Sequence, residues 1–264
     1  MTALSIQNIS LGYQQGSAIK TIMHDFSLDI QLGELISLLG ASGVGKSSLL
    51  RVLAWLNKPL SGSVSLFGEP LTKPHPRVGF VFQSAALLPW LNVRDNVAFG
   101  LDFKRQPKVS KDEQNQRIDD ALKEVGLADA ADKFPSELSG GMAQRAVLAR
   151  GIVRQPQVLL LDEPFSALDA VIREQMQTML REIVQHHNTA AVMVTHDIDE
   201  ALLVSDRIVL VGQGGRIAGT WQPDIPFPRA ARLVELNQIR GEIMQSLHSA
   251  QHYSEQVKTV EFMI

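Results

Sequence analysis

The sequence predicts an α/β fold built on a mainly parallel β-sheet with helices on both faces. Short apolar runs typical of buried strands recur along the chain, and segments with helical periodicity separate them. Strands joined through a helix in one sheet are normally parallel. The composition agrees with a folded protein, because 45% of the 264 residues are hydrophobic and 20% are charged, and a chain of this length can bury a large core.

Extended segments dominate the first third of the chain. Residues 3–13 and 19–32 alternate between apolar and polar side chains, with a turn signal at Gln14–Ser17 between them. Leu35–Leu39 is almost continuously apolar, which favours a strand buried on both faces. A glycine-rich loop and a helix from Lys46 to about Leu56 follow. The next two predicted strands are Val64–Phe67 and Val78–Phe82.

Helical periodicity replaces the strand pattern from about Ser84 to Gln155. Strands then return, separated by helices, and Pro223–Pro228 ends the compact part of the chain. A last helix is predicted from Ala230 to about His248, followed by a polar tail. The other elements predicted in this half are strands at Val158–Leu161, Ala190–Val194 and Ile208–Val211, and helices near Val171–His187 and Ile198–Val204.

Charge and composition exclude several classes of protein. The 25 basic and 28 acidic residues give a formal charge of −3, which argues against binding nucleic acid through a basic face. The absence of cysteine excludes disulfides and thiolate chemistry. The longest apolar runs have five residues, whereas a membrane-spanning helix needs about 20, so none is expected. The first residues also lack the pattern of a secretory signal.

The segment Gly40-Ala-Ser-Gly-Val-Gly-Lys-Ser47 matches a phosphate-binding loop, G-x-x-x-x-G-K-[ST], without a mismatch. It follows a predicted strand and precedes a predicted helix, as that motif requires. Its glycines let successive N–H groups point at phosphate oxygens, and the helix adds its positive end. Lys46 can reach the β- and γ-phosphates, and the Ser47 hydroxyl can bind Mg²⁺.

Two acidic residues, Asp162 and Glu163, come directly after the apolar strand Val158–Leu161. A buried parallel strand delivers such residues to the carboxyl edge of the sheet, where ligands bind in open α/β folds. Asp162 is expected to hold Mg²⁺ and Glu163 to activate the attacking water. The alternative is that these acids only cap the following helix.

A second anion-binding helix start is predicted at Leu138-Ser-Gly-Gly-Met142. A plain serine N-cap is the alternative reading of Ser139. Because the phosphates of one ATP already have a loop, a second such site makes most sense if it serves an ATP held by another subunit.

These motifs, in this order, make the sequence resemble the ATP-binding subunit of ABC transporters over roughly residues 2–222. The resemblance implies a P-loop NTPase (RecA-like) core with a mainly parallel sheet, an antiparallel β-subdomain and an inserted α-helical subdomain at about 84–156. Residues 1–222 would form the ATP-binding domain, and residues 223–264 a helical extension and tail.

The resemblance also implies roles for individual residues, with ATP and Mg²⁺ as cofactors. Glu163, His196, Gln83 and Lys46 would be catalytic, and Ser47, Gln83 and Asp162 would hold the metal. Tyr13 would stack on adenine, although packing or solvent exposure remains an alternative for it. The residues expected to bind the nucleotide are Tyr13, Gly40, Ala41, Ser42, Gly43, Val44, Gly45, Lys46, Ser47, Ser48, Gln83, Ser139, Gly140, Gly141 and Asp169.

In this family two copies pair head to tail, so each ATP would lie between one copy's phosphate loop and the other's Ser139–Gly141. Ser166–Asp169 matches the family's loop across that interface, and Asp169 can also cap the next helix. His196 matches the family's switch histidine, with a simple cap before Asp197 as the alternative.

The partners implied are a second copy of the chain, membrane-spanning permease subunits and, indirectly, a solute-binding protein, with no nucleic acid. The permease would dock in a groove near Gln83–Leu91, where Trp90 could instead belong to the helical core. The expected location is peripheral, on the cytoplasmic face of the inner membrane.

The sequence looks most like the nitrate, sulfonate and taurine importers, in phrases such as LLPWLNVRDNVAFGL. The expected function is therefore to energise an importer of a small anion by ATP hydrolysis. Importers of bicarbonate or of a thiamine-precursor pyrimidine are alternatives, and so, more remotely, are a non-transport ABC ATPase and a cassette that binds ATP without hydrolysing it.

Overall fold

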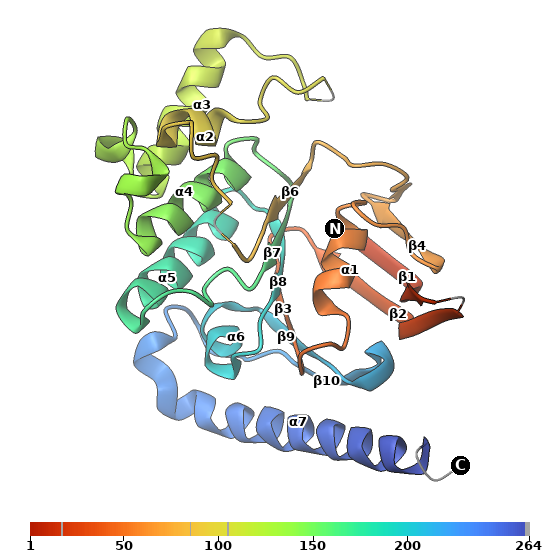
Figure 1. Ribbon diagram of the computed structural model, residues 1–264. Helices are drawn as coiled ribbons and strands as arrows, with labels where there is room; N and C mark the ends of the chain where they lie inside the picture. Colours follow the sequence, from red (N-terminus) through yellow and green to blue (C-terminus); the bar gives the residue numbers. More distant parts are fainter. Residues whose placement is uncertain (17, 85, 105, 262–264) are drawn as a thin grey trace.

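The computed structural model describes residues 1–16, 18–84, 86–104 and 106–261 and arranges them around two β-sheets (Figure 1). The larger sheet has six strands, and its inner strands β3, β8 and β7 are completely buried. Five strands are parallel, and β10 pairs antiparallel with β9 at one edge. The spatial order is β10 (Ile217–Trp221), β9 (Arg207–Val211), β3 (Leu35–Leu39), β8 (Ala190–Val194), β7 (Val158–Asp162) and β6 (Val78–Val81).

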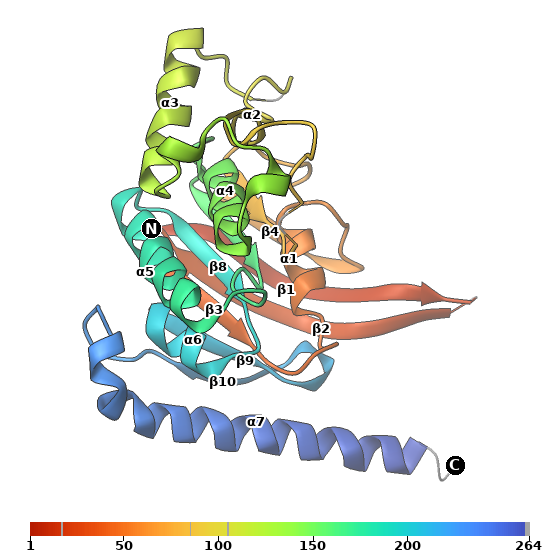
Figure 2. The same ribbon diagram turned by 60° about the vertical axis from the view of Figure 1, so that its left-hand side comes forward.

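The smaller sheet is antiparallel, as the resemblance implied. The two N-terminal strands form a long hairpin that projects from the rest of the molecule (Figure 2). The order of its strands is β2 (Ala18–Gln31), β1 (Thr2–Gln15), β4 (Ser61–Leu66) and β5 (Glu69–Pro70). Ser17 of the predicted turn lies outside the described residues.

Seven α-helices lie within the described ranges. They are α1 (Lys46–Leu53), α2 (Val93–Ala98), α3 (Lys111–Glu124), α4 (Gly140–Ile152), α5 (Ala170–His186), α6 (Ile198–Val204) and α7 (Leu233–Glu261). Short 3₁₀ turns occur at Ala128–Ala130, Pro135–Glu137, Gln213–Gly215 and Ala230–Arg232. None of the helices in the described part of the chain is both long and apolar enough to cross a bilayer.

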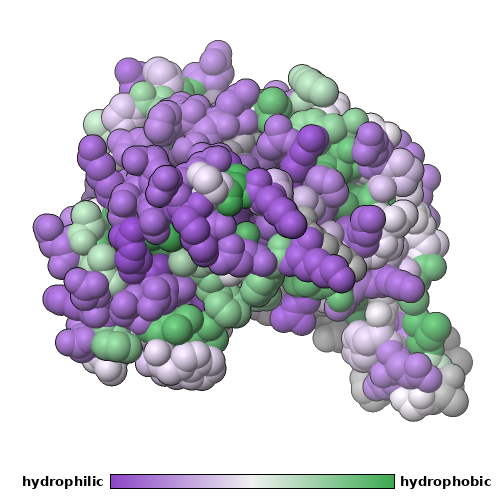
Figure 3. Space-filling view, turned by 90° about the horizontal axis from the view of Figure 1, so that it is seen from above, coloured by the Kyte–Doolittle hydropathy of each residue, from purple (hydrophilic) through white to green (hydrophobic). Residues whose placement is uncertain are grey.

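Side chains of alternating residues cover the large sheet on both faces. Leu159 and Leu161 of β7 point into a core shared with α2, α3, α4 and α5. Val158 and Leu160 of the same strand point to the other side, into a core shared with α1 and the small sheet. The predicted sandwich of a parallel sheet between helices is therefore confirmed. Helices α2 and α3 lie at the upper end of the molecule (Figures 1 and 2), and the face that it presents from above is largely hydrophilic (Figure 3).

Two helix ends differ from the prediction. Helix α1 ends at Leu53 rather than near Leu56, because Trp55 adopts a left-handed conformation with φ of 56° and the chain turns there. Helix α7 continues to Glu261, beyond the predicted end near His248. No proline or glycine follows Gly241, so the sequence contains no residue that would break the helix in this stretch. Its inner side packs through Leu236 and Ile243 against α6 and β9.

A buried side chain in the proline-rich stretch, Arg229, is only 3% exposed and helps to attach this stretch to the rest of the fold. Its guanidinium donates to the carbonyl oxygens of Leu202 and Ser205 at the end of α6, at 2.8 and 2.7 Å, and to those of Pro223 and Ile225, at 2.9 and 2.8 Å. Burial lowers the pKa of Arg229 to about 10. Arg229 thus fixes the chain between α6 and α7.

Replacement of Arg229 by methionine is expected to lower the free energy of unfolding by about 2–4 kcal/mol, because four carbonyl oxygens lose their donor. Urea unfolding followed by circular dichroism measures the change. The exposed Arg232 provides a matched control, for which Arg232→Met should cost less than about 0.5 kcal/mol. An equally small effect of Arg229→Met would contradict this account of the segment.

Candidate functional site

The candidate site lies at the carboxyl edge of the large sheet, where four neighbouring parallel strands end. Gly40 follows β3, Gln83 lies two residues beyond β6, Asp162 and Glu163 lie at the end of β7, and His196 lies two residues beyond β8. Because β6, β7, β8 and β3 are adjacent and parallel, residues that are far apart in the sequence meet at this edge. The sequence predicted this meeting from the strand that precedes each motif.

The loop between β3 and α1 has the backbone of a phosphate-binding loop. Gly40, Gly43 and Gly45 have φ values of 151°, 86° and 101°, which side chains larger than hydrogen disfavour. A Cβ on Gly40 would also overlap the carbonyl oxygen of Val211 at the end of β9. Gly45 caps α1 without a side-chain hydrogen bond, so the first N–H groups of the helix have no side-chain acceptor there.

Lys46 bends back over this loop. Its Nζ donates to the carbonyl oxygens of Gly40 at 2.7 Å and Ala41 at 2.9 Å, and the side chain is only 6% exposed. Burial lowers the pKa of the Lys46 ammonium, against the opposing effect of Glu163 and Asp162. The fold thus holds a partly desolvated positive charge where the loop curls.

A hydroxyl and a carboxylate meet beside this lysine. The Ser47 hydroxyl in the first turn of α1 donates to Asp162 Oδ1 at 2.7 Å, and Asp162 is almost completely buried. Both groups offer hard oxygen ligands of the kind that Mg²⁺ prefers. Their contact brings together the two residues that the sequence analysis assigned to a metal ion.

Glu163 is the centre of a second group of contacts. Its Oε2 accepts a hydrogen bond from Gln83 Nε2 at 3.1 Å and lies 3.4 Å from His196 Nδ1. Its φ is 44°, a left-handed conformation that is strained for a residue with a side chain, and its N–H donates to Val194 O at 3.0 Å. The strain places the carboxylate against both partners.

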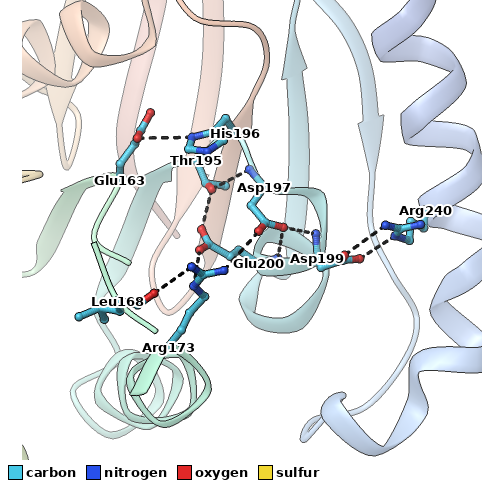
Figure 4. Close-up of polar contacts among 9 residues, drawn as sticks. All are labelled: Glu163, Leu168, Arg173, Thr195, His196, Asp197, Asp199, Glu200 and Arg240. Carbon is cyan, nitrogen blue, oxygen red and sulfur yellow. Dashed lines mark hydrogen bonds and ion pairs between the residues drawn. The ribbon is translucent and has the colours of Figure 1, made fainter. Parts of the chain in front are cut away.

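A further polar network that the sequence did not predict lies beside His196 (Figure 4). Thr195 donates from Oγ1 to Glu200 Oε2 at 2.7 Å, and Glu200 Oε1 lies 3.6 Å from Arg173 Nε. Burial raises the pKa of Glu200. The three residues lie on β8's C-terminal extension, α6 and α5, and no local sequence pattern connects them.

The predicted second anion site is separate from the first within one chain. Ser139 is the N-cap of α4 and its Oγ accepts from Met142 N at 3.3 Å, so the alternative reading as a cap holds. Ser139 and Gly140 are nevertheless exposed. None of the hydrogen bonds or ion pairs found among the described residues joins Ser139–Gly141 to the phosphate loop. Asp169 likewise caps α5, with Oδ1 accepting from Val171 N and Ile172 N.

Tyr13 and the segment around Trp90 are both on the surface. Tyr13 is 50% exposed and pairs with Lys20 across the hairpin, while Ile22 of the same β2 strand approaches Gly45. Trp90 is 69% exposed, so it does not belong to the helical core. Phe82 and Pro89 are also exposed, and Ala85 of the predicted groove lies outside the described residues.

A parallel α/β sheet with a phosphate-binding loop after β3 and acidic residues after β7 defines a P-loop nucleotide-binding protein. The sequence profile of the ABC transporter family matches residues 23–166. The chain belongs to the ABC transporter family, whose cassettes are ATPases, and it carries the cassette's mixed fold.

Comparisons with known proteins agree. The chain is 44% identical over 233 residues to the aliphatic sulfonates import ATP-binding protein SsuB 1 of Xanthomonas axonopodis pv. citri, covering 87% of this chain and 92% of that protein. It is 47% identical over 209 residues to the nitrate import ATP-binding protein NrtC of Synechococcus elongatus, covering 78% of this chain but 32% of that longer protein.

A bicarbonate transport ATP-binding protein, CmpC of Synechococcus elongatus, is 44% identical over 229 residues, covering 86% of this chain and 34% of that protein. Among solved structures, a dimeric ATP-binding cassette in a post-hydrolysis state with ADP and Pi is similar, with a TM-score of 0.73 and 30% identity. That similarity covers 83% of this chain and 98% of the other.

Proposed function

We propose that this chain binds and hydrolyses ATP to energise a multi-subunit importer, with residues 1–222 as the ATP-binding domain and residues 223–264 as an extension. The observation that carries the proposal is the meeting of Lys46, Asp162, Glu163 and His196 at one edge of the sheet. The names of its relatives support import, because they are ATP-binding proteins of sulfonate, nitrate and bicarbonate transport.

In this proposal the phosphates of ATP lie on the loop Gly40–Ser48. The loop N–H groups and the helix start bind phosphate oxygens, and Lys46 turns from its two carbonyl partners to the β- and γ-phosphates. Tyr13, exposed on the hairpin near this loop, stacks on adenine. Burial has removed water from the Lys46 ammonium, and the negative phosphates would stabilise its charge. Movement of the side chain toward the phosphates is therefore favourable.

Ser47, Asp162 and Gln83 would hold Mg²⁺, as the donor set of hydroxyl, carboxylate and amide oxygen allows. When bound, the ion neutralises charge on the phosphate oxygens. The hydrogen bond between Ser47 and Asp162 supports this part of the proposal, because the two side chains lie in contact. Gln83 bonds to Glu163 in the same region and would also sense whether the nucleotide is complete.

Glu163 is proposed to orient the attacking water and accept its proton. Gln83 and His196 contact one of its carboxylate oxygens, which leaves the other oxygen for the water. His196, with its imidazole 60% exposed, would contact the γ-phosphate. Hydrolysis then depends mainly on positioning and on charge stabilisation by Lys46 and its neighbours.

Two copies are proposed to enclose the nucleotide, with Ser139–Gly141 of one facing the phosphate loop of the other. The exposure of Ser139 and Gly140 supports this arrangement, and the similar solved cassette is a dimer. Reciprocal use of the same surfaces produces a closed two-fold dimer. The segment that ends at Asp169 would lie at the interface.

Membrane-spanning permease subunits are proposed to dock on the segment near Gln83–Leu91, in which Pro89 and Trp90 are exposed. Exposed aromatic residues of this kind are typical of a surface that receives a helix. The buried side chain of Asn96 fixes the backbone of this segment, because its amide makes hydrogen bonds to the backbone of Leu88 and Leu91. The chain would then act at the cytoplasmic face of the inner membrane, and a solute-binding protein would deliver the solute.

The proposed solute is a small anion, namely a sulfonate, taurine or nitrate, with bicarbonate or a thiamine-precursor pyrimidine as the alternatives. Uptake of each labelled compound would be measured in cells that lack the chain and are complemented with wild-type protein or with Lys46→Ala. Restoration of uptake of one anion by the wild type alone would support the proposal. Equal uptake with both proteins would contradict it.

Replacement of Trp90 by alanine is expected to abolish co-purification with the permease and to leave ATP binding unchanged, because the side chain is exposed and lies outside the nucleotide site. Pull-down from solubilised membranes and nucleotide titration measure the two properties. Phe134→Ala, which removes an exposed aromatic residue elsewhere, is the control. Normal co-purification of Trp90→Ala would place the docking surface elsewhere.

A further inference from the structure

The turn that carries His196 is held by the residue before it. Thr195 Oγ1 accepts a hydrogen bond from Asp197 N at 3.0 Å and donates to Glu200 Oε2 at 2.7 Å, so the hydroxyl spans His196 to the backbone of Asp197 and also binds the side chain of Glu200 (Figure 4). Thr195 is 1% exposed, whereas the His196 side chain is mostly exposed. The orientation of this exposed imidazole therefore depends on buried neighbours.

Glu200 continues this contact toward α5. It lies in the first turn of α6, is 6% exposed and presents its second oxygen to Arg173 Nε at 3.6 Å. Arg173 Nη1 lies 3.8 Å from Asp197 Oδ2. Desolvation raises the pKa of Glu200, and the positive charge of Arg173 acts against that shift.

Arg173 also reaches back to the segment that follows Glu163. Its Nη2 donates to the carbonyl oxygen of Leu168 at 2.9 Å. One guanidinium thus joins the chain after β7 with the chain after β8 (Figure 4). Glu163 lies on the first of these segments and His196 on the second, with 3.4 Å between Glu163 Oε2 and His196 Nδ1.

We propose that Arg173, Thr195 and Glu200 are positioning residues for ATP hydrolysis, which fix the turn of His196 relative to Glu163. This inference rests on the proposed function of the site. No hydrogen bond or ion pair among the described residues joins any of the three to Glu163 or to the side chain of His196, so they act mainly through the backbone that carries these groups. A displacement of about 1 Å in a catalytic group is enough to reduce a rate about a hundredfold.

A purely structural role explains these contacts less well. Helix α6 already has an N-cap, because Asp197 Oδ1 accepts from Asp199 N and Glu200 N. The Glu200 side chain is therefore not needed to start the helix. Buried ion pairs also contribute little to stability on balance, because desolvation offsets their attraction. The geometry of the turn is what these three residues determine.

Turnover kinetics of purified protein test the proposal. Arg173→Met, Glu200→Gln and Thr195→Val should each lower kcat about tenfold to a hundredfold, with KM and the equilibrium affinity for ATP within about twofold of wild type. Thr195→Ser keeps the hydroxyl and should restore kcat to within about threefold. If kcat is unchanged in all three variants, or Thr195→Ser is as slow as Thr195→Val, the inference is wrong.

Arg240→Met is a matched control on the other side of α6. It removes a guanidinium that contacts Asp199, at 2.8 and 3.3 Å, in the same turn of the helix but away from Glu163. Its kcat should equal that of wild type. A loss equal to that of Arg173→Met would mean that any damage to α6 slows the enzyme, and would overturn the specific role of Arg173.

Hydrogen exchange provides a readout that does not depend on turnover. Arg173→Met should speed exchange of the Asp197 amide, which donates to Thr195 within the turn between β8 and α6 and makes no hydrogen bond to Arg173 itself. Unchanged exchange at Asp197 would refute the inference by itself. Failure of the proposed function is recognised separately, because wild type and Glu163→Gln would then turn over ATP at equal rates.

Discussion

Lys46→Ala is expected to weaken ATP binding about tenfold to a hundredfold and to lower turnover at least about a hundredfold. The ammonium lies under the phosphate-binding loop with two carbonyl oxygens as partners. When phosphate oxygens arrive, it exchanges these neutral acceptors for negatively charged ones, and the attraction between opposite charges is strong in a partly desolvated site. The methyl side chain of alanine has neither the charge nor the hydrogen-bond donors that bind phosphate.

The same substitution should not damage the nucleotide-free fold. Burial lowers the pKa of Lys46, which means that the folded protein disfavours its charged form. Removal of the ammonium therefore relieves a desolvation cost, which offsets the loss of its two hydrogen bonds. Thermal unfolding without ATP should be near that of wild type, while the stabilisation that ATP adds should disappear.

Isothermal titration with ATP and a coupled phosphate-release assay measure these effects, and Lys58→Ala is the control because Lys58 is exposed and outside the loop. ATP affinity and turnover of Lys46→Ala equal to those of wild type would refute the placement of phosphate on this loop. A large loss of stability without ATP would instead show that Lys46 is needed for folding.

The sequence was a good guide to the site because its motifs sit at strand ends. A buried parallel strand reads as a short apolar run, and Leu35–Leu39, Val158–Leu161 and Ala190–Val194 are runs of this kind. Parallel strands bring their carboxyl ends to one edge, so the residues that follow must meet. The contacts of Ser47 with Asp162 and of Glu163 with Gln83 and His196 follow from this regularity.

The elements that the sequence did not predict lack such a regularity. Strand β5 contains only Glu69 and Pro70, which is too short for a pattern. Strand β10 is an exposed edge strand, and its residues Ile217–Trp221 do not show a buried face. Helix α7 ends at Glu261 and is longer than predicted, because polar residues can continue a helix as readily as they form a tail when no proline or glycine interrupts them.

Contacts between helices were also beyond the sequence. Arg173 and Glu200 stand on α5 and α6, and nothing in the local sequence indicates that they meet. Their pairing depends on how both helices pack on the sheet. The same holds for Arg229, whose four carbonyl acceptors come from two separate segments. Long-range polar contacts of this kind are visible only in three dimensions.

Glu163→Gln is expected to lower kcat at least about a hundredfold while ATP still binds with about wild-type affinity. The amide has nearly the same shape as the carboxylate, and its oxygen still accepts from Gln83, so the left-handed backbone at this position experiences no new strain. What the amide cannot do at neutral pH is take a proton from water. The defect should therefore appear in the chemical step and not in binding.

The substitution also separates binding from hydrolysis in the proposed dimer. With ATP bound and not consumed, the contacts to the γ-phosphate persist, and Glu163→Gln should elute as a dimer in size-exclusion chromatography with ATP and as a monomer without it. Glu174→Gln, an exposed glutamate on α5, serves as the control and should hydrolyse ATP at the wild-type rate. Wild-type turnover by Glu163→Gln would remove Glu163 from the chemistry. Loss of ATP binding would instead show that the carboxylate is needed to hold the nucleotide. In that case the rate of hydrolysis would not report on the role of Glu163 in the chemical step.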